Sequence, residues 1–239
     1  MIEGHPVLKV DLHLHTSQDP ADVIPHDACA LVDRAASVGF DAIAITLHDH
    51  QLVDPRVVDY ARERQVAMIP GVERTIEGRH VVLINFSHGT DQVRTFADLA
   101  SLKSRVNGLV IAPHPFFPSR PCLRSALDAH ADLFDAVEWS YFWTTGMNFN
   151  ARAAQWAASR GKPLIGNSDL HDLRQLGRTC SYVFSERDPE AICAAIREGQ
   201  VSLHTSPVPK LELASVVGGM IRRGNKPHAT ADAGRLATT

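Results

Sequence analysis

The chain has 239 residues, of which 44% are hydrophobic, and its 24 Lys and Arg residues against 27 Asp and Glu residues give a formal net charge of −3. A chain of this length buries about 70% of the surface that its unfolded form exposes, so we expect one soluble globular domain that needs no disulfides. The near-neutral charge disfavours a broad nucleic-acid-binding surface but is compatible with a small anionic substrate.

The cysteine spacing and the apolar segments indicate a cytoplasmic protein. The cysteines are far apart and form no CxxC pair, which is typical of reduced thiols. They are Cys29, Cys122, Cys180 and Cys193. Charged residues interrupt the first apolar stretch and no apolar run approaches 18 residues, so we expect neither a signal peptide nor a membrane span.

Short β-branched segments alternate with Ala-rich helical patterns along most of the chain. We expect strands at 7–12, 41–46, 66–71, 81–86, 109–113, 136–140, 163–166, 180–185 and 201–204. We expect helices at 27–38, 55–64, 91–106, 123–130, 148–160 and 189–198. This rhythm predicts a mostly parallel sheet with covered faces, either closed as a barrel or open. The pattern fades from about residue 218, so we assign the domain to residues 1–213 and a mobile tail to 214–239.

The first strand ends in an HxH motif. His13 and His15 are two residues apart, so a strand directs both imidazoles to the same side. Two imidazoles at a strand end can bind one metal ion, although two histidines in a buried turn are an equally good interpretation of the motif alone.

Metal-binding residue types follow several later strands as well. The carboxyl ends of the strands build the active site in α/β barrels, so these side chains should converge. They are His48, Glu73, His114, Asp169 and His171.

His80 opens a strand instead of following one. Gly78 favours a tight hairpin after Glu73, and the gap is too short for a parallel crossover of about a dozen residues. The hairpin would return His80 to the same end as Glu73.

The resulting donor set contains imidazoles and carboxylates without thiolates. Such a set suits Zn, Mn or Fe and is too rich for one tetrahedral ion, so we expect two or three divalent ions. Glu73 can bridge a pair of ions roughly 3.5–4 Å apart, which would hold a shared hydroxide as the nucleophile. Glu73 and Asp169 are therefore the candidate catalytic residues.

Over residues 7–207 the chain resembles the polymerase and histidinol phosphatase (PHP) superfamily. The motifs are HxH at 13–15, Thr46-Leu47-His48-Asp49, Gly71-Val72-Glu73, His80, Pro113-His114-Pro115, Ser168-Asp169-Leu170-His171 and Leu176-Gly177-Arg178-Thr179. The resemblance implies an α/β fold, a distorted (β/α)7 TIM-like barrel in a single domain, and metal-dependent hydrolysis of phosphate esters.

The resemblance also implies how the ligands divide among three ions. His13, His15, Glu73 and Asp169 would surround the first. Glu73, His80 and His114 would hold the second. His48 and His171 would hold the third.

The sequence departs from the family pattern at one ligand of the third ion. Many members carry SDG after HxHT, whereas this chain reads SQDPAD at 17–22. Counting back from the helix end at Gly39 favours Asp22 as the remaining ligand, with Asp19 as the alternative.

Other polar and aromatic residues are weaker candidates. Arg178 and Arg120 are expected to bind substrate phosphate, and Arg74 is a further candidate, because a guanidinium suits a phosphate oxygen. We expect Asp11 to orient an imidazole and Glu138 to be a core carboxylate that could also contact the cluster. His50 is a minor ligand candidate, and His204 could face the site. We expect solvated side chains at His5, His26, His88, His130 and His228.

The leading functional hypothesis is a metal-dependent phosphoesterase. Its substrate would be a small organic phosphate, possibly a nucleotide, which a wall of aromatic residues between 116 and 143 could stack against; core packing explains that wall equally well. One alternative is hydrolysis of a non-phosphate ester or carbamate, and another is a non-catalytic PHP-like accessory module. Nucleic acid is an unlikely partner, no membrane partner is expected, and no oligomeric state is indicated.

Overall fold

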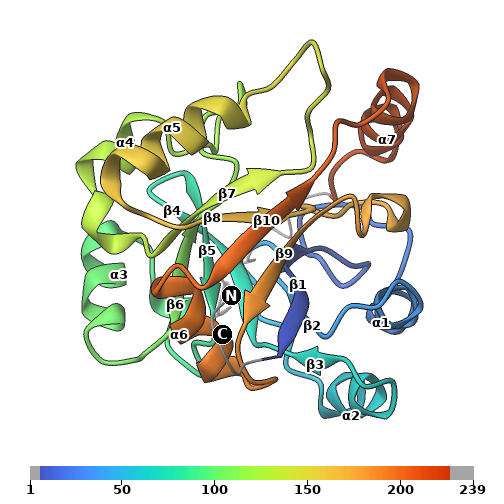
Figure 1. The fold of residues 1–239 in the computed structure, drawn as a ribbon, viewed down its shortest axis with the longest axis horizontal. Helices are drawn as coiled ribbons and strands as arrows, with labels where there is room; N and C mark the ends of the chain where they lie inside the picture. The colour runs from blue at the N-terminus through green and yellow to red at the C-terminus, as the bar shows by residue number, and fades with distance from the viewer. Residues whose placement is uncertain (1–5, 227–239) are drawn as a thin grey trace, which may run out of the picture.

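The computed structural model describes residues 6–226, which form a mixed α/β fold (Figure 1). Its strands are β1 (Val7–Leu14), β2 (Ala42–Ile45), β3 (Ala67–Met68), β4 (Gly71–Ile76), β5 (Arg79–Ile84), β6 (Leu109–Ala112), β7 (Ala136–Ser140), β8 (Leu164–Asn167), β9 (Thr179–Phe184) and β10 (Val201–Thr205). Its α-helices are α1 (Ala28–Ser37), α2 (Pro55–Glu63), α3 (Phe96–Lys103), α4 (Ser125–Ala129), α5 (Asn150–Arg160), α6 (Pro189–Arg197) and α7 (Lys210–Arg223).

The expected alternation of strands and helices is confirmed, and local sequence signals explain several boundaries. Asp54 and Asp188 each accept a hydrogen bond from the first turn of the helix that follows, and a proline occupies the first helical position after each. Gly161 ends α5 with φ at 61°. The strand expected at 66–71 is divided: β3 is short, and β4 begins separately at Gly71.

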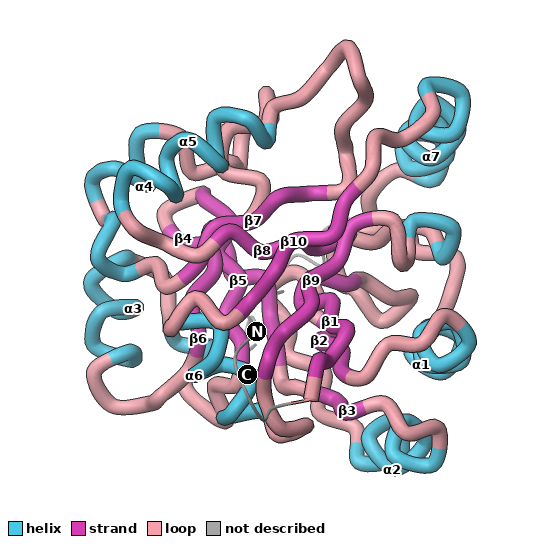
Figure 2. Tube along the Cα trace, viewed as in Figure 1, coloured by secondary structure: helices cyan, strands magenta, loops and turns pink. Residues whose placement is uncertain are grey.

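The described strands form two five-stranded sheets, ordered β10-β9-β1-β2-β3 and β4-β5-β6-β7-β8 (Figure 2). The parallel pairs are β1–β2, β2–β3, β6–β7 and β7–β8. The antiparallel pairs are β1–β9, β9–β10, β4–β5 and β5–β6. The expectation of a mostly parallel sheet is therefore wrong. The expected hairpin is confirmed: β4 and β5 turn at Glu77 and Gly78, both with positive φ, and a connection this short permits only antiparallel return.

Two isolated β-bridges link the two sheets in the described chain. Leu14 at the end of β1 pairs with Leu170 after β8, and His48 after β2 pairs with Glu73 of β4. The sheets also meet where Gly166 of β8 donates to the Ser181 hydroxyl of β9. These contacts join the sheets without continuous ladders, so a closed (β/α)7 barrel is not confirmed. The expected α/β class stands, with two sheets in place of a closed barrel.

The buried side chains form layers inside and outside the sheets. The interior layer includes Leu12 of β1 and Ile111 of β6, and α6 closes it with Ile192. Helices α1 and α2 cover the outer face of β1 and β2, whereas α3, α4 and α5 cover the second sheet on the opposite side of the molecule (Figure 1). This packing fixes both sheets, and with them the strand ends that carry the polar side chains of the site.

Helix α7 occupies part of the segment that we expected to be a mobile tail. It runs from Lys210 to Arg223 and buries Leu213, Val216 and Gly219. Regular structure therefore continues ten residues past the expected boundary at residue 213, and that boundary stays a prediction. The remainder of the expected tail, at 227–239, lies outside the described residues. Within residues 6–226, no helix has both the length and the hydrophobicity that a membrane crossing requires.

Candidate metal centre

An irregularity in β1 directs the HxH histidines into the site. Three steps of β1, from Asp11 to Leu14, match two steps of β2, from Ile43 to Ile45, so β1 carries one extra residue. Before this bulge Leu12 packs in the interior, and after it Leu14 packs on the outer face. The alternation is thus reversed, and His13 and His15 are left on the interior side, where both are fully buried.

Asp19 holds two imidazoles in place. Its carboxylate accepts hydrogen bonds at 2.9 Å from Nδ1 of His15, Nδ1 of His48 and the backbone N–H of His48. Burial alone would raise the pKa of Asp19, but these two histidines lower it well below its usual range. Because Nδ1 of each ring is engaged by Asp19, each Nε2 atom is available to face the centre of the site.

Glu73 lies at the centre of the cluster and is 1% exposed. Gly71 lets β4 come this close to β2, since a Cβ there would lie 2.8 Å from Cγ2 of Thr46. Oε2 of Glu73 is 3.3, 3.5 and 3.2 Å from Nε2 of His13, His15 and His48. Oε1 is 2.8 Å from Nδ1 of His80 and 3.2 Å from Nε2 of His114. The two oxygens thus face two separate groups of imidazoles, as a bridging carboxylate would.

Two of the candidate ligands sit on strained backbone. His114 and Asp169 follow β6 and β8 with φ of 28° and 47°, in the left-handed region that favours glycine. Asp11 helps to fix the second turn, because its buried carboxylate accepts hydrogen bonds from the backbone N–H groups of Ser168 and His13. Asp11 therefore positions backbone next to the site, whereas we expected it to orient an imidazole ring.

Glu138 performs the ring-orienting role. This fully buried carboxylate of β7 lies 2.8 Å from Nδ1 of His13 and accepts hydrogen bonds from the backbone N–H of His114 and from Nδ2 of Asn167. With Nδ1 of His13 donating to Glu138, Nε2 carries the lone pair that can bind an ion. Its role was the less favoured of our two interpretations of Glu138, because one acidic residue inside an apolar strand carries no motif.

His171 and Asp22 form the outer edge of the cluster. Nε2 of His171 is 3.1 Å from Oδ2 of Asp22, and the same oxygen is 4.0 Å from Nδ1 of His48. Asp22 lines the cavity, whereas Asp19 is buried beneath it. The role of Asp22 as the third-site ligand stays a prediction.

The donor atoms fit divalent ions. Nε2 of His13 and Nε2 of His15 are buried and have no hydrogen-bond partner. Donor atoms within 4.8 Å of one another form three overlapping groups: His13–Glu73–His114, His13–His15–Asp169 and His15–His48–Glu73. Nitrogen and oxygen ligands of this kind suit Zn, Mn or Fe. Glu73 belongs to two of these groups, as a carboxylate shared between two ions would. The division of the remaining ligands among the ions stays a prediction.

The charges within the cluster compensate one another. Burial raises the pKa of Glu73 and Asp169, but the surrounding imidazoles outweigh this and hold both below their usual range. Burial lowers the pKa of His48, but Glu73 and the Asp19 hydrogen bond outweigh it and raise that pKa to about 9. Divalent ions would displace these protons, so we expect ion binding to be pH-dependent.

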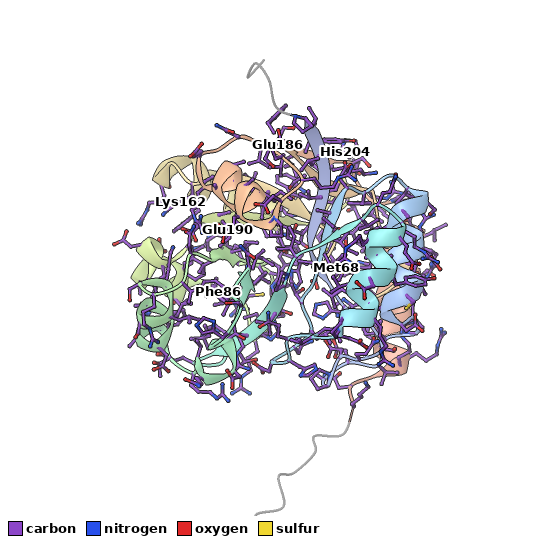
Figure 3. The ribbon with its side chains drawn as sticks, turned by 90° about the horizontal axis from the view of Figure 1, so that it is seen from below. Met68, Phe86, Lys162, Glu186, Glu190 and His204 are labelled. Atoms are coloured by element: carbon purple, nitrogen blue, oxygen red, sulfur yellow. The ribbon has the colours of Figure 1, made fainter. Side chains whose placement is uncertain are left out.

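Several candidate residues lie outside the cluster. His50 is exposed, and His204 is exposed at the periphery of the molecule beside Tyr182 (Figure 3). His26 is buried and donates from Nε2 to the carbonyl oxygen of His15, so the expectation that it is solvated is wrong. His130 stacks on Phe96, and Nδ1 of His88 contacts the Ser87 hydroxyl. His5 and His228 lie outside the described residues.

The candidate arginines do not line the cavity above the cluster in the described chain. Arg178 forms an ion pair with Glu212 of α7 at 2.9 Å. Arg120 presents its backbone carbonyl to Arg79. Arg74 is buried and pairs with Asp49, so it anchors the loop after β2. The substrate-binding roles of Arg178 and Arg120 stay predictions.

A cavity of about 840 Å³ opens above the cluster. Its floor includes His48, Glu73, His80, His114, Asp169 and His171. Its wall is mostly apolar and comes from α7 and from loops after β1, β6 and β7. Of the aromatic residues between 116 and 143, Phe117 and Phe142 contribute to this wall, whereas Tyr141 is fully buried in the core. The site therefore combines a polar floor with an apolar wall.

Comparisons with known proteins match a segment of the sequence and, separately, the fold. The PHP-associated family model matches residues 148–201. The PolC-type DNA polymerase III of Caldanaerobacter subterraneus subsp. tengcongensis is 40% identical over 67 residues, a match that spans 27% of this chain and 5% of that protein. The chain therefore corresponds to a small part of this relative.

Solved structures extend the likeness over most of the chain. A two-domain protein from Bacteroides vulgatus that contains a predicted PHP-like metal-dependent phosphoesterase matches 91% of this chain and 71% of its own, with a TM-score of 0.65 and 21% identity. The lesion-specific endonuclease Q of Pyrococcus furiosus matches 83% of this chain and 58% of its own, with a TM-score of 0.57 and 18% identity. The family match over residues 148–201 therefore confirms the PHP resemblance drawn from the motifs, and the solved structures show that the fold is shared over most of the chain.

Proposed function

We propose that the chain is a metal-dependent phosphoesterase that acts on a small organic phosphate. The observation that carries this proposal is the position of Glu73, whose two oxygens lie between imidazoles in overlapping donor groups at the floor of the cavity. The PHP-like phosphoesterase and endonuclease Q neighbours support a hydrolase. We propose that two or three Zn, Mn or Fe ions are held by His13, His15, Asp22, His48, Glu73, His80, His114, Asp169 and His171.

The ions would supply a nucleophile at neutral pH and stabilise the charge that develops on the phosphoryl oxygens. The reaction adds water to phosphorus and breaks the P–O bond to the alcohol, which leaves with a proton. The chain's own contribution is positioning. Asp19 and Glu138 hold the Nδ1 atoms of three imidazoles, so their Nε2 atoms keep fixed directions. Glu73 and Asp169 supply the carboxylate oxygens that would hold the ions beneath the reacting phosphate.

A nucleic-acid substrate is the second candidate. The likeness to endonuclease Q favours it, because that protein has been solved with a duplex that carries an abasic lesion at its active site. Against it stands the cavity wall, which offers few cationic side chains for successive phosphates among the described residues. The small organic phosphate therefore remains the preferred substrate class.

The test combines metal content with turnover. Purified chain should contain two to three divalent ions by elemental analysis and should hydrolyse p-nitrophenyl phosphate. Chelation should abolish the hydrolysis and added Mn²⁺ should restore it. Asp169→Asn should lower kcat/KM by about 10³-fold, since metal ions contribute several kcal/mol to such reactions. The exposed Asp132→Asn is the matched control and should keep full activity.

Failure would be equally clear. Less than one ion per chain, together with no turnover after reconstitution with Mn²⁺ or Zn²⁺, would contradict the proposal and favour a non-catalytic accessory module. Turnover of aryl esters or carbamates in place of phosphates would assign the same site to carbonyl hydrolysis. Cleavage of abasic DNA without turnover of small phosphates would favour the second candidate.

A further inference from the structure

The wall of the cavity is almost entirely apolar, which the proposed hydrolysis does not require. Helix α7 contributes Leu213, Val217, Met220 and Ile221. The loops contribute Val23, Ile24, Phe117, Pro118, Pro121, Phe142, Met147 and Phe149. These side chains come from four separate parts of the chain and face one space above the metal-ligating residues. A site built for a sugar or a polyanion would present hydrogen-bond donors there instead.

Among the described residues of the wall, the one cationic side chain, Arg223, already has hydrogen-bond partners. Arg223 donates from Nε to the carbonyl oxygen of Val23 at 3.0 Å and from Nη2 to that of His171 at 3.1 Å. Among the described lining residues outside the floor, Asp22, Ser119 and Asn225 are the remaining polar side chains, and Asp22 lies beside His171 at the edge of the floor. A negatively charged group of a substrate would therefore bind at the floor, and the rest of the substrate would contact the apolar side chains of the wall.

Helix α7 is held over the floor at both of its ends. Near its start, Glu212 accepts hydrogen bonds from Tyr141 and from Arg178. Past its end, Asn225 pairs with Asp22, and Lys226 donates to backbone carbonyl oxygens of Ser17 and Asp19. The apolar wall is thus a fixed part of the site, linked directly to the loop that carries Asp22.

Two wall residues keep part of their apolar surface open to solvent. Val217 and Ile221 are 36% and 76% exposed, and both line the cavity. Large exposed apolar side chains beside a cavity favour binding of an apolar group. The volume of about 840 Å³ exceeds what a phosphate alone would fill and lies within the range of pockets for organic ligands.

We propose that the substrate is a phosphate ester whose organic part is a bulky apolar group, alkyl or aryl, which packs against α7 and the phenylalanines of the loops. This inference rests on the proposed function, since the phosphate is placed on the floor. It assigns substrate selection to Val217, Ile221 and their neighbours in the wall. Arg178 does not line the cavity and contributes through its ion pair with Glu212 of α7.

Binding of non-hydrolysable alkylphosphonates tests the inference without requiring turnover. Calorimetry on Mn²⁺-loaded chain with methyl-, butyl- and octylphosphonate should show a Kd that falls by about threefold for each added CH2 that becomes buried. In V217S/I221S the preference for octyl- over methylphosphonate should shrink by about tenfold. L211S is the matched control, because Leu211 lies on the same helix, is 87% exposed and does not line the cavity. It should keep the wild-type preference.

The outcomes separate this inference from the proposed function. Equal affinity for methyl- and octylphosphonate, or no binding of either, would overturn the inference whatever the hydrolytic activity. Tighter binding of a dinucleotide than of octylphosphonate would also overturn it and would assign the wall to a nucleic acid. Chain-length-dependent binding without hydrolysis of any phosphate ester would support the apolar site and contradict the phosphoesterase.

Discussion

The floor and the wall of the cavity differ in chemistry and in how they are built. The floor residues His114 and Asp169 lie just after strand ends, where the buried carboxylates of Glu138 and Asp11 accept hydrogen bonds from the nearby backbone. Wall residues such as Met147 and Ile221 lie on loops and on the last described helix, and they line the cavity with apolar side chains. Under the proposed function this difference would separate two tasks: the floor would determine which reaction is possible, and the wall would determine which ester binds.

The largest effect on stability should come from the helix that carries the wall. Leu213 of α7 is 6% exposed and packs with Tyr141 and Val208. Leu213→Ala should lower the free energy of unfolding by about 2–5 kcal/mol, as buried leucines generally do. Leu211→Ala, two positions away and 87% exposed, should change it by less than about 0.5 kcal/mol.

Urea denaturation of both variants measures this contrast. Similar stabilities would mean that α7 does not pack on the domain, and the comparison between a fixed wall and a fixed floor would fail.

A smaller effect should come from the support of the floor. Glu138→Gln places an amide NH2 where the carboxylate accepts hydrogen bonds from His13, His114 and Asn167. Both carboxylate oxygens of Glu138 accept hydrogen bonds, so the NH2 group of the glutamine must face a donor and one of these bonds is lost. The orientation of His13 is then no longer fixed. We expect metal affinity to fall about 10–100-fold, which chelator competition would measure.

Glu63→Gln provides the control, since the Glu63 side chain is 76% exposed and distant from the cluster residues in the fold. Unchanged metal affinity in Glu138→Gln would show that Glu138 is only a packing residue.

The smallest effect concerns acid stability of the chelated protein. The pKa of Asp19 is lowered in the folded chain, because its hydrogen bonds with His15 and His48 outweigh the effect of burial. A lowered folded pKa contributes stability above the unfolded value near 4, and this contribution is lost as the pH falls below it. Asp19→Asn should therefore reduce the slope of unfolding free energy against pH below pH 4, by up to about 1.4 kcal/mol per pH unit.

Denaturation midpoints between pH 3 and pH 5 give that slope. Asp132→Asn, at an exposed position, should retain the wild-type slope. A wild-type slope in Asp19→Asn would contradict the assigned hydrogen bonds.

The floor was predictable because its residues combine position with chemistry. Strand ends in an α/β chain converge, so His48, Asp169 and the turn that returns His80 could be placed together from spacing alone. The wall gave a weaker signal: of the aromatic residues between 116 and 143 that suggested a stacking wall, Phe117 and Phe142 line the cavity. Helix α7 contains Gly218 and Gly219, which weaken a helical pattern, and its apolar residues serve both the core and the cavity.

Two supporting features were also beyond the sequence. Glu138 is a single acidic residue in an apolar strand, and its partners are 125 and 24 residues away. The antiparallel pairing of β9 with β1 depends on tertiary packing, since no short connection links these strands. Contacts over such separations are set by the whole fold and not by a local pattern.

The central claim is that the buried imidazole and carboxylate atoms at the floor hold divalent ions. The most direct measurement is anomalous scattering at the manganese edge from crystals of the chain soaked in Mn²⁺. The account predicts two or three peaks surrounded by His13, His15, Glu73, His114 and Asp169. Absence of any peak inside this cluster, or a peak only at the protein surface, would contradict it.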